Sequence, residues 1–455
     1  MAVDLVIRGG RVWSSRGSTM EDIYVSDGKI VAVGGELDAS ERVDASGLEV
    51  LPGVVDAHVH IPDPDIPERE DFLTGTAAAL SNGTTTLLEH HHSLPVKNVA
   101  DLREKEAYLA GRSLVDFGLI AHGRPDNLDD LEDLWQQGIY AFKIFTCALH
   151  GAPAVPSDVM LDLFRRVAAF DGYCLVHCED DRITAANEER LRAAGSVGGE
   201  AILGWRTLEA ELVAVATTTL LARLTGARIG IAHVSHPDVL DIIKREQESG
   251  ADVAVESCPH YFYLNDEIVR RRGAWAKFTP PARAHEFNDE MWRRLEGGEI
   301  DMISADHAPA TREEKSRGTE SMWEAPFGIP GVETTLALML NGAAEGWISL
   351  ATVARVMAEG PARVYGLSER KGALAPGLDA DMVLVDLEGS RSLRHEDVRS
   401  RVGWTPYDGS TLKGSTVMTI SRGSVVFWDG QVLADPGWGT YIPRPGSLAA
   451  DGVRV

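Results

Sequence analysis

The sequence has too few cysteines to build a disulfide framework. Its 455 residues include only four: Cys147, Cys174, Cys178 and Cys258. A chain of this length would need many more, so a disulfide scaffold is excluded. Cys174 and Cys178 flank His177 in the apolar string YCLVHC. We interpret them as small buried core thiols, with metal binding as the alternative.

The sequence also lacks a long apolar segment and is short of positive charge. No run approaches the 18 or so residues that cross a bilayer, and the first residues, MAVDLVIRGGRVW, alternate apolar and polar side chains unlike a signal peptide. We therefore expect no membrane association and a cytoplasmic location. The 44 Lys and Arg against 69 Asp and Glu give a net charge of -25, which disfavours nucleic acid and anionic lipid as partners.

Strand-like segments occupy both ends of the chain. Residues 1–51 read as short apolar runs separated by turns, of which Asp27-Gly28 is typical of a two-residue hairpin. Residues 371–445 have the same character, and residues 446–455 form a C-terminal tail. We predict one small β-sandwich domain built from both termini.

The middle, residues 52–366, alternates β-branched runs with amphipathic segments such as residues 158–170, the pattern of βαβ units. Eight runs are predicted strands: residues 54–60, 84–90, 115–122, 141–146, 173–178, 228–234, 252–258 and 300–307. Eight such alternations predict a (β/α)8 TIM barrel, an α/β fold whose active site lies where the C-terminal strand ends meet.

Most of these runs end in a side chain that can bind metal or transfer protons. These residues are His58, His60, His90, His122, Lys143, His177, His233, Asp306 and His307. His58 and His60 are two apart on one strand, so both side chains point the same way and can bind one ion. Any of these histidines alone is explained as well by packing or surface placement. Their repetition at successive strand ends favours a metal centre.

Lys143 and Asp306 add an amine and a carboxylate to the histidines. Lys143 lies in the apolar segment YAFKIF, where burial is expected to lower its pKa. The neutral amine can react with carbon dioxide to give a carbamate that bridges two cations; an ion pair with a nearby carboxylate is the alternative. Asp306 can coordinate a metal and accept a proton, or cap a turn. Such a site would favour the oxyanion of a tetrahedral intermediate.

Nearly the whole chain carries a set of motifs: VDAHVH, FKIF, LVHCE, IAHVSHP, ESCPHYF, FTPPAR, SADHAP, KGALAPGLDADMVLVDL and TPYDGSTLKG. In this combination the sequence resembles the cyclic amidohydrolases of the hydantoinase, allantoinase and dihydroorotase group. The resemblance implies two divalent ions of the zinc type, a hydroxide that bridges them and attacks a ring carbonyl, and a catalytic Asp306 that moves the proton to the leaving ring nitrogen. The implied ligands are His58, His60 and Asp306 on one metal, His177 and His233 on the other, and carboxylated Lys143 between them.

Several positions bear on the substrate. Dihydroorotases usually have an arginine just after the HxH, and this chain has none there. Ala148 stands where D-hydantoinases have a tyrosine, and is as small as in L-hydantoinase-like and allantoinase-like members. Residues 89–92, Glu-His-His-His, replace something like Glu-Met-Pro. Of these, His90, His91 and His92 either line the pocket or pack at its mouth. Thr279 and the loop from Gly328 match segments that hold the cyclic amide in the group, or are turn residues.

We therefore predict hydrolysis of a small cyclic amide or ureide, with a hydantoin-like ring such as allantoin preferred over dihydroorotate. The alternatives are dihydroorotase-like, dihydropyrimidinase-like or cyclic-imide activity, a mononuclear deaminase or deacetylase, and a noncatalytic scaffold protein on the same fold. The presence of all six candidate ligands disfavours the scaffold. The resemblance also implies a homo-oligomer, either a tetramer or a dimer.

Overall fold

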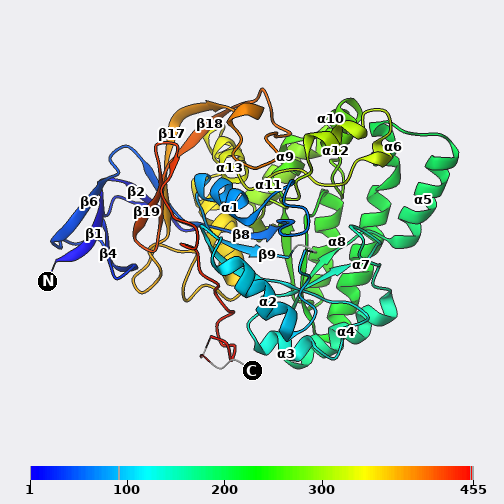
Figure 1. The fold of residues 1–455 in the computed structure, drawn as a ribbon, viewed down its shortest axis with the longest axis horizontal. Coiled ribbons are helices and arrows are strands. Elements are labelled where there is room, and N and C mark those ends of the chain that lie inside the picture. Colours follow the sequence, from blue (N-terminus) through cyan, green and yellow to red (C-terminus); the bar gives the residue numbers. More distant parts are fainter. Residues whose placement is uncertain (1, 91–92, 451, 453–455) are drawn as a thin grey trace.

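The computed structural model describes residues 2–90, 93–450 and 452, and its central feature is a parallel β-barrel (Figure 1). Two sheets of parallel strands supply it, in the orders β10-β9-β8 and β11-β12-β13-β14-β15-β16. Their bounds are β8 Val54–Val59, β9 Thr84–Glu89, β10 Asp116–Leu119, β11 Ala121–His122, β12 Phe142–Phe145, β13 Tyr173–His177, β14 Arg228–Ile231, β15 Val253–Ser257 and β16 Met302–Ile303. Seven of the eight predicted runs contain one of these strands each. The third run, residues 115–122, contains two, β10 and β11.

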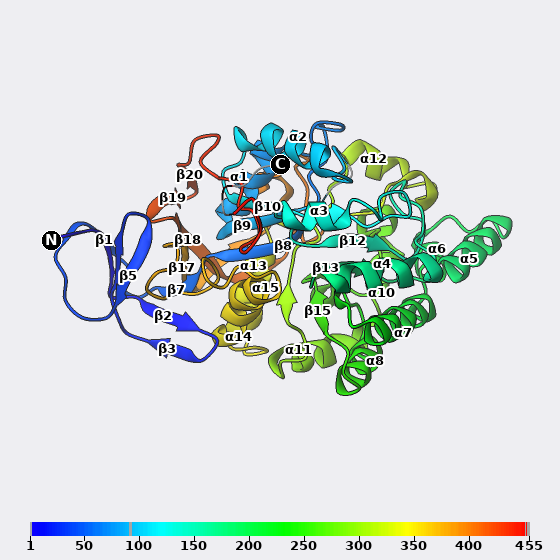
Figure 2. The ribbon, with the colours of Figure 1, turned by 90° about the horizontal axis from the view of Figure 1, so that it is seen from below.

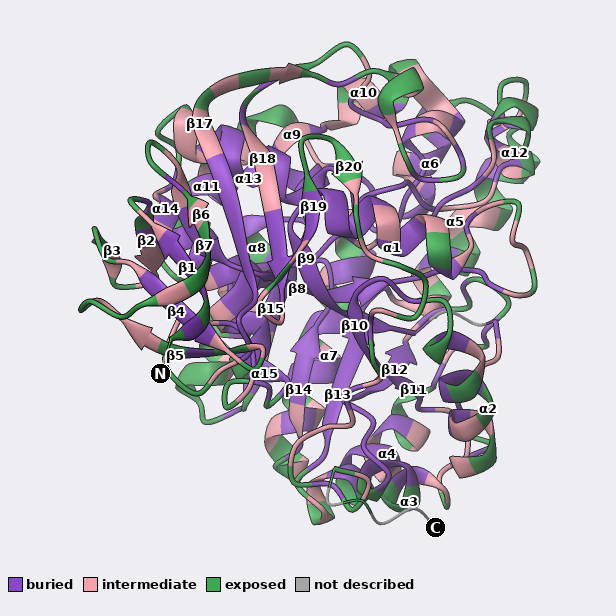
Figure 3. Cartoon of the chain, turned by 60° about the vertical axis from the view of Figure 1, so that its left-hand side comes forward, coloured by how far each residue is buried: buried purple, intermediate pink, exposed green. Residues whose placement is uncertain are grey.

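The barrel closes between its first and last strands. Val59 forms a parallel bridge with His307, and the backbone N–H of His60 donates to the carbonyl of His307 at 2.8 Å. Figure 3 shows the barrel strands buried along their length, because the surrounding helices cover their outer faces. This closure places the C-terminal ends of all eight strands around a single mouth.

Several of the helices that surround the barrel bury one apolar face. In α4, for example, Met160, Leu163, Phe164 and Val167 are buried at helical spacing. The helices are α1 Phe72–Ser81, α2 Val99–Ala110, α3 Leu131–Gln136, α4 Ser157–Ala169, α5 Asp181–Ala193, α6 Gly199–Trp205, α7 Leu208–Thr225, α8 Pro237–Glu248, α9 His260–Tyr263, α10 Asp266–Arg272, α11 Asn288–Glu296, α12 Arg312–Arg317, α13 Thr335–Ala344, α14 Leu350–Ala354 and α15 Gly360–Val364. Within the described residues, no helix is both long and apolar enough to span a bilayer.

A β-sandwich domain contains strands from both ends of the chain, and Figure 2 shows it at one end of the molecule with α5 at the other. Its sheets have the orders β5-β4-β1-β6 and β20-β19-β18-β17-β7-β2-β3. The bounds are β1 Val3–Arg8, β2 Arg11–Ser14, β3 Gly17–Thr19, β4 Ile23–Ser26, β5 Lys29–Val33, β6 Ala39–Asp44, β7 Glu49–Pro52, β17 Met382–Ser392, β18 Thr411–Ser421, β19 Ser424–Trp428 and β20 Gln431–Val432. The fold is therefore the predicted (β/α)8 barrel with a β-sandwich.

Local and distant contacts both define the sandwich. The predicted hairpin joins β4 to β5, and its turn residues Asp27 and Gly28 have positive φ values of 51° and 74°. Antiparallel pairing of β7 with β17 joins the N-terminal and C-terminal segments, and Leu51 lies opposite Val383. The exact domain boundaries, 1–51 with 371–445 and 52–366, stay a prediction, as does the tail 446–455.

Candidate metal centre

All six predicted ligands lie together at the barrel mouth. His58 Nε2 is 3.2 Å from both His60 Nε2 and Asp306 Oδ1, and 3.3 Å from Lys143 Nζ. His177 Nδ1 lies 2.9 Å from His233 Nε2. The two groups adjoin, because the ligand atoms of His58, His233 and Asp306 all lie within 4.8 Å of one another. The structure thus brings together side chains that are separated by up to 248 positions in the sequence.

The chemistry of this donor set fits divalent cations. Burial lowers the pKa of His58 and His233 well below the usual value, and nearby Lys143 acts in the same direction, so the imidazoles are neutral. Burial alone would raise the pKa of Asp306, but His58, His60 and His233 hold it well below its usual value. Neutral imidazoles whose nitrogens face one another beside an ionised carboxylate are ligands that zinc-type ions prefer.

The backbone turns sharply at two of these ligands. His233 and Asp306 follow β14 and β16 and have φ values of 40° and 44°. A positive φ is uncommon for residues other than glycine, and such strained positions concentrate at functional sites. In both cases the unusual conformation occurs where a strand has ended and the side chain enters the barrel mouth.

Two buried carboxylates that the sequence interpretation missed support the first strand. Glu256 on β15 lies with its Oε1 atom 2.5 Å from His58 Nδ1, so it fixes the ring whose Nε2 faces the other ligands. Asp56 accepts hydrogen bonds from the backbone N–H groups of His58 and Ala305, at 3.3 and 3.1 Å, and so links β8 to the segment after β16. Burial raises the pKa of Asp56 to about 7. In the sequence, Asp56 and Glu256 are each an acidic residue within an apolar run, and this is the feature that could have indicated their role.

A third missed carboxylate, Glu179, orients His177. Its Oε2 atom is 2.8 Å from His177 Nε2 and 3.2 Å from Arg206 Nη1, and accepts a hydrogen bond from Thr279 Oγ1 at 2.7 Å. Although burial opposes ionisation, Arg206 and His177 lower the pKa of Glu179 to about 2. Thr279, predicted to bind substrate, therefore has its hydroxyl directed to this network. The motif LVHCE contains Glu179, but nothing local indicated Arg206.

Lys143 is buried, and none of the acidic side chains that the structure describes forms an ion pair with it. Burial lowers its pKa to about 8, although Glu256 and Asp306 act in the opposite direction. Among the described residues, no carboxylate oxygen lies within 4.0 Å of its amine, whose closest recorded contact is the imidazole of His58. This geometry disfavours the ion-pair alternative, and the lowered pKa increases the fraction of the amine that is neutral and reactive.

The predicted substrate-binding residues have mixed positions. His90 is buried, with its ring centroid 4.5 Å from that of His58 and 4.2 Å from that of His60. His91 and His92 lie outside the described residues. Ala148 is exposed on the loop after β12 and donates its N–H to Asp181 at 3.0 Å. The substrate roles of all these residues stay predictions.

Gly328 lies where the backbone comes very close to the loop after β16. Its φ is 109°, and a Cβ atom there would lie 2.1 Å from the carbonyl oxygen of Ala308. Only glycine fits this approach. A small cavity of about 30 Å³ opens beside it, lined in part by His60, Arg69, His150 and Phe327. Neither His150 nor Phe327 was predicted from the sequence.

Comparison with known proteins gives one family. The model of the family described as "Amidohydrolase family" matches residues 50–426. The L-hydantoinase of Paenarthrobacter aurescens is 34% identical over 449 residues, 97% of this chain and 98% of that protein. The allantoinase of Solibacter usitatus is 32% identical over 462 residues, 99% of each chain.

Solved structures agree with this result over the same length. The L-hydantoinase (dihydropyrimidinase) from Arthrobacter aurescens superimposes with a TM-score of 0.94 at 34% identity, covering 97% of this chain and all of that one. A D-hydantoinase gives a TM-score of 0.92 at 29% identity, with 97% and 99% coverage. The similarity therefore includes both the barrel and the sandwich.

Proposed function

This chain belongs to the amidohydrolase family, and from that premise we propose that it is a metal-dependent hydrolase of cyclic amides or ureides, similar to hydantoinases and allantoinases. The observation that carries the proposal is the convergence of four imidazoles, the amine of Lys143 and the carboxylate of Asp306 at the barrel mouth. The similarity to an L-hydantoinase and an allantoinase over nearly the full chain supports the substrate class.

We assign each ligand to one of two divalent ions, which we propose to be zinc. His58, His60 and Asp306 would hold one ion and His177 with His233 the other, while Lys143, as a carbamate, would contribute an oxygen to each. When bound, these ions would polarise a ring carbonyl and lower the pKa of water at the site. Glu256 and Glu179 hold the rings of His58 and His177 in the orientation that this assignment requires.

Asp306 is the residue that moves the proton. Its carboxylate is ionised at neutral pH, because the neighbouring imidazoles hold its pKa well below the usual value. It accepts a proton from the attacking water as the new C–O bond forms. It then gives this proton to the ring nitrogen as the C–N bond breaks, which yields a carboxylate and an open-chain amine or ureido group.

Carbamate formation needs the neutral amine of Lys143. With a pKa near 8 about a tenth of the lysine would be neutral at pH 7, against about one part in 3,000 for an exposed lysine. The amine then attacks carbon dioxide, forms an N–C bond and loses a proton. The resulting anion would be held by the two cations, which draws the equilibrium toward the carbamate.

We propose a hydantoin-like ring as substrate in preference to dihydroorotate. Arg69 is the arginine that lines the small cavity at the mouth, and both carboxylate oxygens of Glu314 already accept hydrogen bonds from it, at 2.6 to 3.0 Å. This ion pair already offsets the charge of Arg69, which makes it a poor partner for a substrate carboxylate. A buried carboxylate without a partner is strongly disfavoured. The homo-oligomer stays a proposal that the resemblance alone supports, and the cytoplasmic location also stays a proposal.

A substrate panel tests the proposal. The zinc-loaded protein would be given allantoin, 5-substituted hydantoins, dihydrouracil, dihydroorotate and a cyclic imide, and loss of the ring amide would be followed by ultraviolet absorbance. We expect kcat/KM to be highest for a hydantoin or allantoin. Asp306→Asn, as the control, should lower kcat by about 100-fold or more. A higher kcat/KM for dihydroorotate than for every other compound would contradict the substrate assignment.

A further inference from the structure

Residues 318–328, which we call the strap, run from the end of α12 to the mouth of the barrel. The side chain of the strap next to Gly328 is Phe327, and it lines the small cavity beside the predicted ligand His60. Phe327 is only partly buried: it packs on the apolar cluster that contains Phe145 and also borders the cavity. The position of this ring therefore limits the room beside the metal centre.

Two buried lysines hold the strap by its backbone. The amine of Lys277 donates to the carbonyl oxygens of Met322 and Ala325, at 2.8 and 2.6 Å. The amine of Lys315 donates to the carbonyl oxygen of Pro326 at 3.0 Å and to that of Lys277 at 3.3 Å. Both lysines are at most 3% exposed. Three of the four acceptors belong to the strap, so the two amines fix the backbone next to the cavity.

Neither amine has an acidic partner, which is unusual for a buried lysine. In the part of the chain that the structure describes, no carboxylate oxygen lies within 4.0 Å of Lys277 Nζ or Lys315 Nζ, and both amines donate to backbone carbonyls. Burial lowers the pKa of Lys277 to about 8 and that of Lys315 well below its usual value. A neutral amine still has two N–H groups, one for each of its two carbonyl acceptors. Without Lys277, the carbonyl oxygen of buried Ala325 would lose its donor, which is unfavourable.

Aromatic and cationic groups also surround the ring of Phe327. The centroid of the Trp205 ring lies 5.1 Å from that of Phe327. The amine of Lys277 is 4.5 Å from the same centroid, and the guanidinium carbon of Arg206 is 5.3 Å from it. Cations are attracted to the face of an aromatic ring. Lys277 thus contacts both the backbone of the strap and the ring that borders the cavity.

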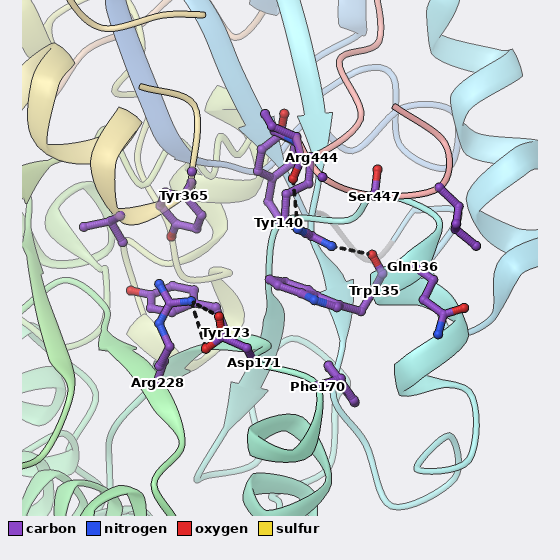
Figure 4. A pocket seen from close by; sticks show the side chains of 15 residues that line it. Trp135, Gln136, Tyr140, Phe170, Asp171, Tyr173, Arg228, Tyr365, Arg444 and Ser447 are labelled. Carbon is purple, nitrogen blue, oxygen red and sulfur yellow. Dashed lines mark hydrogen bonds and ion pairs between the residues drawn. The ribbon is translucent and has the colours of Figure 1, made fainter. Parts of the chain in front are cut away.

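A comparable anchor lies at the other end of the barrel. In the cavity drawn in Figure 4, Arg444 donates from its two terminal nitrogens to the carbonyl oxygens of Trp135 and Pro445, at 2.9 and 3.1 Å. Tyr173 in the wall of that cavity begins β13, whereas His177 ends the same strand at the metal centre. Arg444 is therefore a suitable control, because it fixes backbone through carbonyl oxygens but does not reach the mouth.

We propose that Phe327 determines which ring substituents the hydrolase accepts, and that Lys277 and Lys315 are positioning residues that hold it in place. The inference rests on the proposed function, because it assigns a specificity residue to that site. The cyclic amide meets the predicted ligands, and its substituent extends into the cavity that Phe327 and His150 line. Only about 30 Å³ is open there, so the fixed wall admits a small substituent and hinders a bulky one.

Two substrates that differ only in their substituent measure this discrimination. The zinc-loaded protein would be given 5-methylhydantoin and 5-benzylhydantoin, and the ratio of kcat/KM for the benzyl compound to kcat/KM for the methyl compound would be compared among variants. Phe327→Ala removes the wall and should raise this ratio about tenfold. Lys277→Met and Lys315→Met loosen the wall, so each should raise the ratio about threefold. An unchanged or lower ratio in Phe327→Ala would overturn the proposal.

A double-mutant cycle shows whether Lys277 acts through Phe327. If it does, the protein with both Lys277→Met and Phe327→Ala should have the ratio of Phe327→Ala alone, because no wall is left to position. Effects of the two changes that multiply would refute the positioning role. The control Arg444→Met should leave the ratio unaltered. A rise as large as that in Lys277→Met would show that loss of any backbone anchor has this effect, and would refute the role too.

Hydrogen–deuterium exchange followed by mass spectrometry tests the anchoring without any turnover. In zinc-loaded Lys277→Met and Lys315→Met, the amides of the strap should exchange about tenfold faster than in the wild type, while peptides from the barrel strands keep their rates. Equal strap rates in the variants and the wild type would refute the anchoring, whether or not hydantoins are hydrolysed. If the wild type hydrolyses neither hydantoin although the strap responds, the proposed hydrolase function fails and the specificity assignment fails with it, while the anchoring stands.

Discussion

Two lysines are buried to the same extent in two regions of this molecule, with opposite consequences. At the junction of barrel and sandwich, the amine of Lys371 lies 2.7 Å from Asp116, 2.9 Å from Asp379 and 2.6 Å from Asp381. These carboxylates raise its pKa above the usual value although burial opposes this. At the barrel mouth, Lys143 meets the imidazole of His58 instead. Burial then prevails and lowers its pKa to about 8.

The pKa values of the two lysines differ because their nearest carboxylates contact different groups. Glu256 is close enough to Lys143 to affect its titration, but its Oε1 atom contacts His58 Nδ1 at 2.5 Å. At the junction, Asp116 and Asp381 instead direct oxygens at Lys371, and Arg422 completes the pairing of Asp116. Burial of a lysine is therefore not informative without its partners. A fully paired lysine holds structure together, whereas one whose acids are occupied elsewhere is available for chemistry.

The largest expected effect is from Lys143→Ala. Removal of the amine takes away the proposed bridging ligand, so bound metal should fall from about two ions per chain and kcat/KM by about three orders of magnitude or more. Elemental analysis and the hydantoin assay measure both. Acetate or another short carboxylate should restore part of each. Full activity in the variant would show that the buried amine has no such role.

Lys371→Met should instead damage stability and leave the chemistry intact. It would leave three buried carboxylates without their shared cation, which typically costs about 3–5 kcal/mol of unfolding free energy. Urea denaturation measures this loss, and kcat of the protein that remains folded should be unchanged. Normal stability together with lost activity would reverse the roles that we assign to the two lysines.

Glu256→Gln tests whether the carboxylate at the mouth acts through His58. The amide keeps the shape but loses the charge that fixes the ring, so metal affinity or kcat should fall by about 10- to 100-fold. Metal titration and kcat measured at saturating zinc separate the two effects. Asp379→Asn, a matched change at the junction, should leave both quantities unaltered. An effect of equal size in the two variants would point to general destabilisation.

The junction should also determine part of the acid sensitivity. Burial would raise the pKa values of Asp116 and Asp379. Lys371 and Arg422 nevertheless lower the pKa of Asp116, and Lys371 and Arg370 lower that of Asp379. A depressed folded-state pKa adds stability that is fully present above the unfolded value, near 3.9, and that is lost progressively as the pH falls from there through the lowered folded-state pKa. The stability gap between wild type and Lys371→Met should therefore be widest near neutral pH and narrow below about pH 4. Denaturation curves at pH 7 and pH 3.5 measure the gap, and a gap that does not change would contradict this account.

His90→Met is expected to have the smallest effect. Its ring packs against His58 and His60, but the six proposed ligands do not include it. Metal content should be retained, and the ratio of kcat/KM values for allantoin and a 5-substituted hydantoin should shift by about tenfold or less. Loss of one metal ion in this variant would instead make His90 a ligand.

Local patterns were sufficient to predict the barrel and to indicate which side chains meet at its mouth; the assignment of those side chains as metal ligands came from the resemblance and stays a prediction. Each strand is a short apolar run in the sequence. Most of these runs end in a histidine, lysine or aspartate, so the position of that residue at the C-terminal end of its strand can be read from the sequence. The turn at Asp27-Gly28 was predictable for the same reason, because the two residues themselves determine its geometry. Parallel strands in a closed barrel then bring the ends together without further information.

The supporting contacts could not be predicted from the sequence, because they join distant positions. Thr279 meets Glu179 from 100 residues away, and Lys371 meets Asp116 from 255 residues away. Glu256 resembles any other acidic residue at a strand end until the structure shows it against His58. Such partners depend on the packing of whole elements, which periodicity and motifs do not encode.

The central claim is that Lys143 becomes a carbamate, and carbon-13 NMR tests it most directly. Zinc-loaded protein equilibrated with ¹³C-bicarbonate should show one carbamate resonance per chain, absent from Lys143→Ala and retained in a folded control such as Arg166→Gln. A fully active, metal-loaded protein without that resonance would contradict the account.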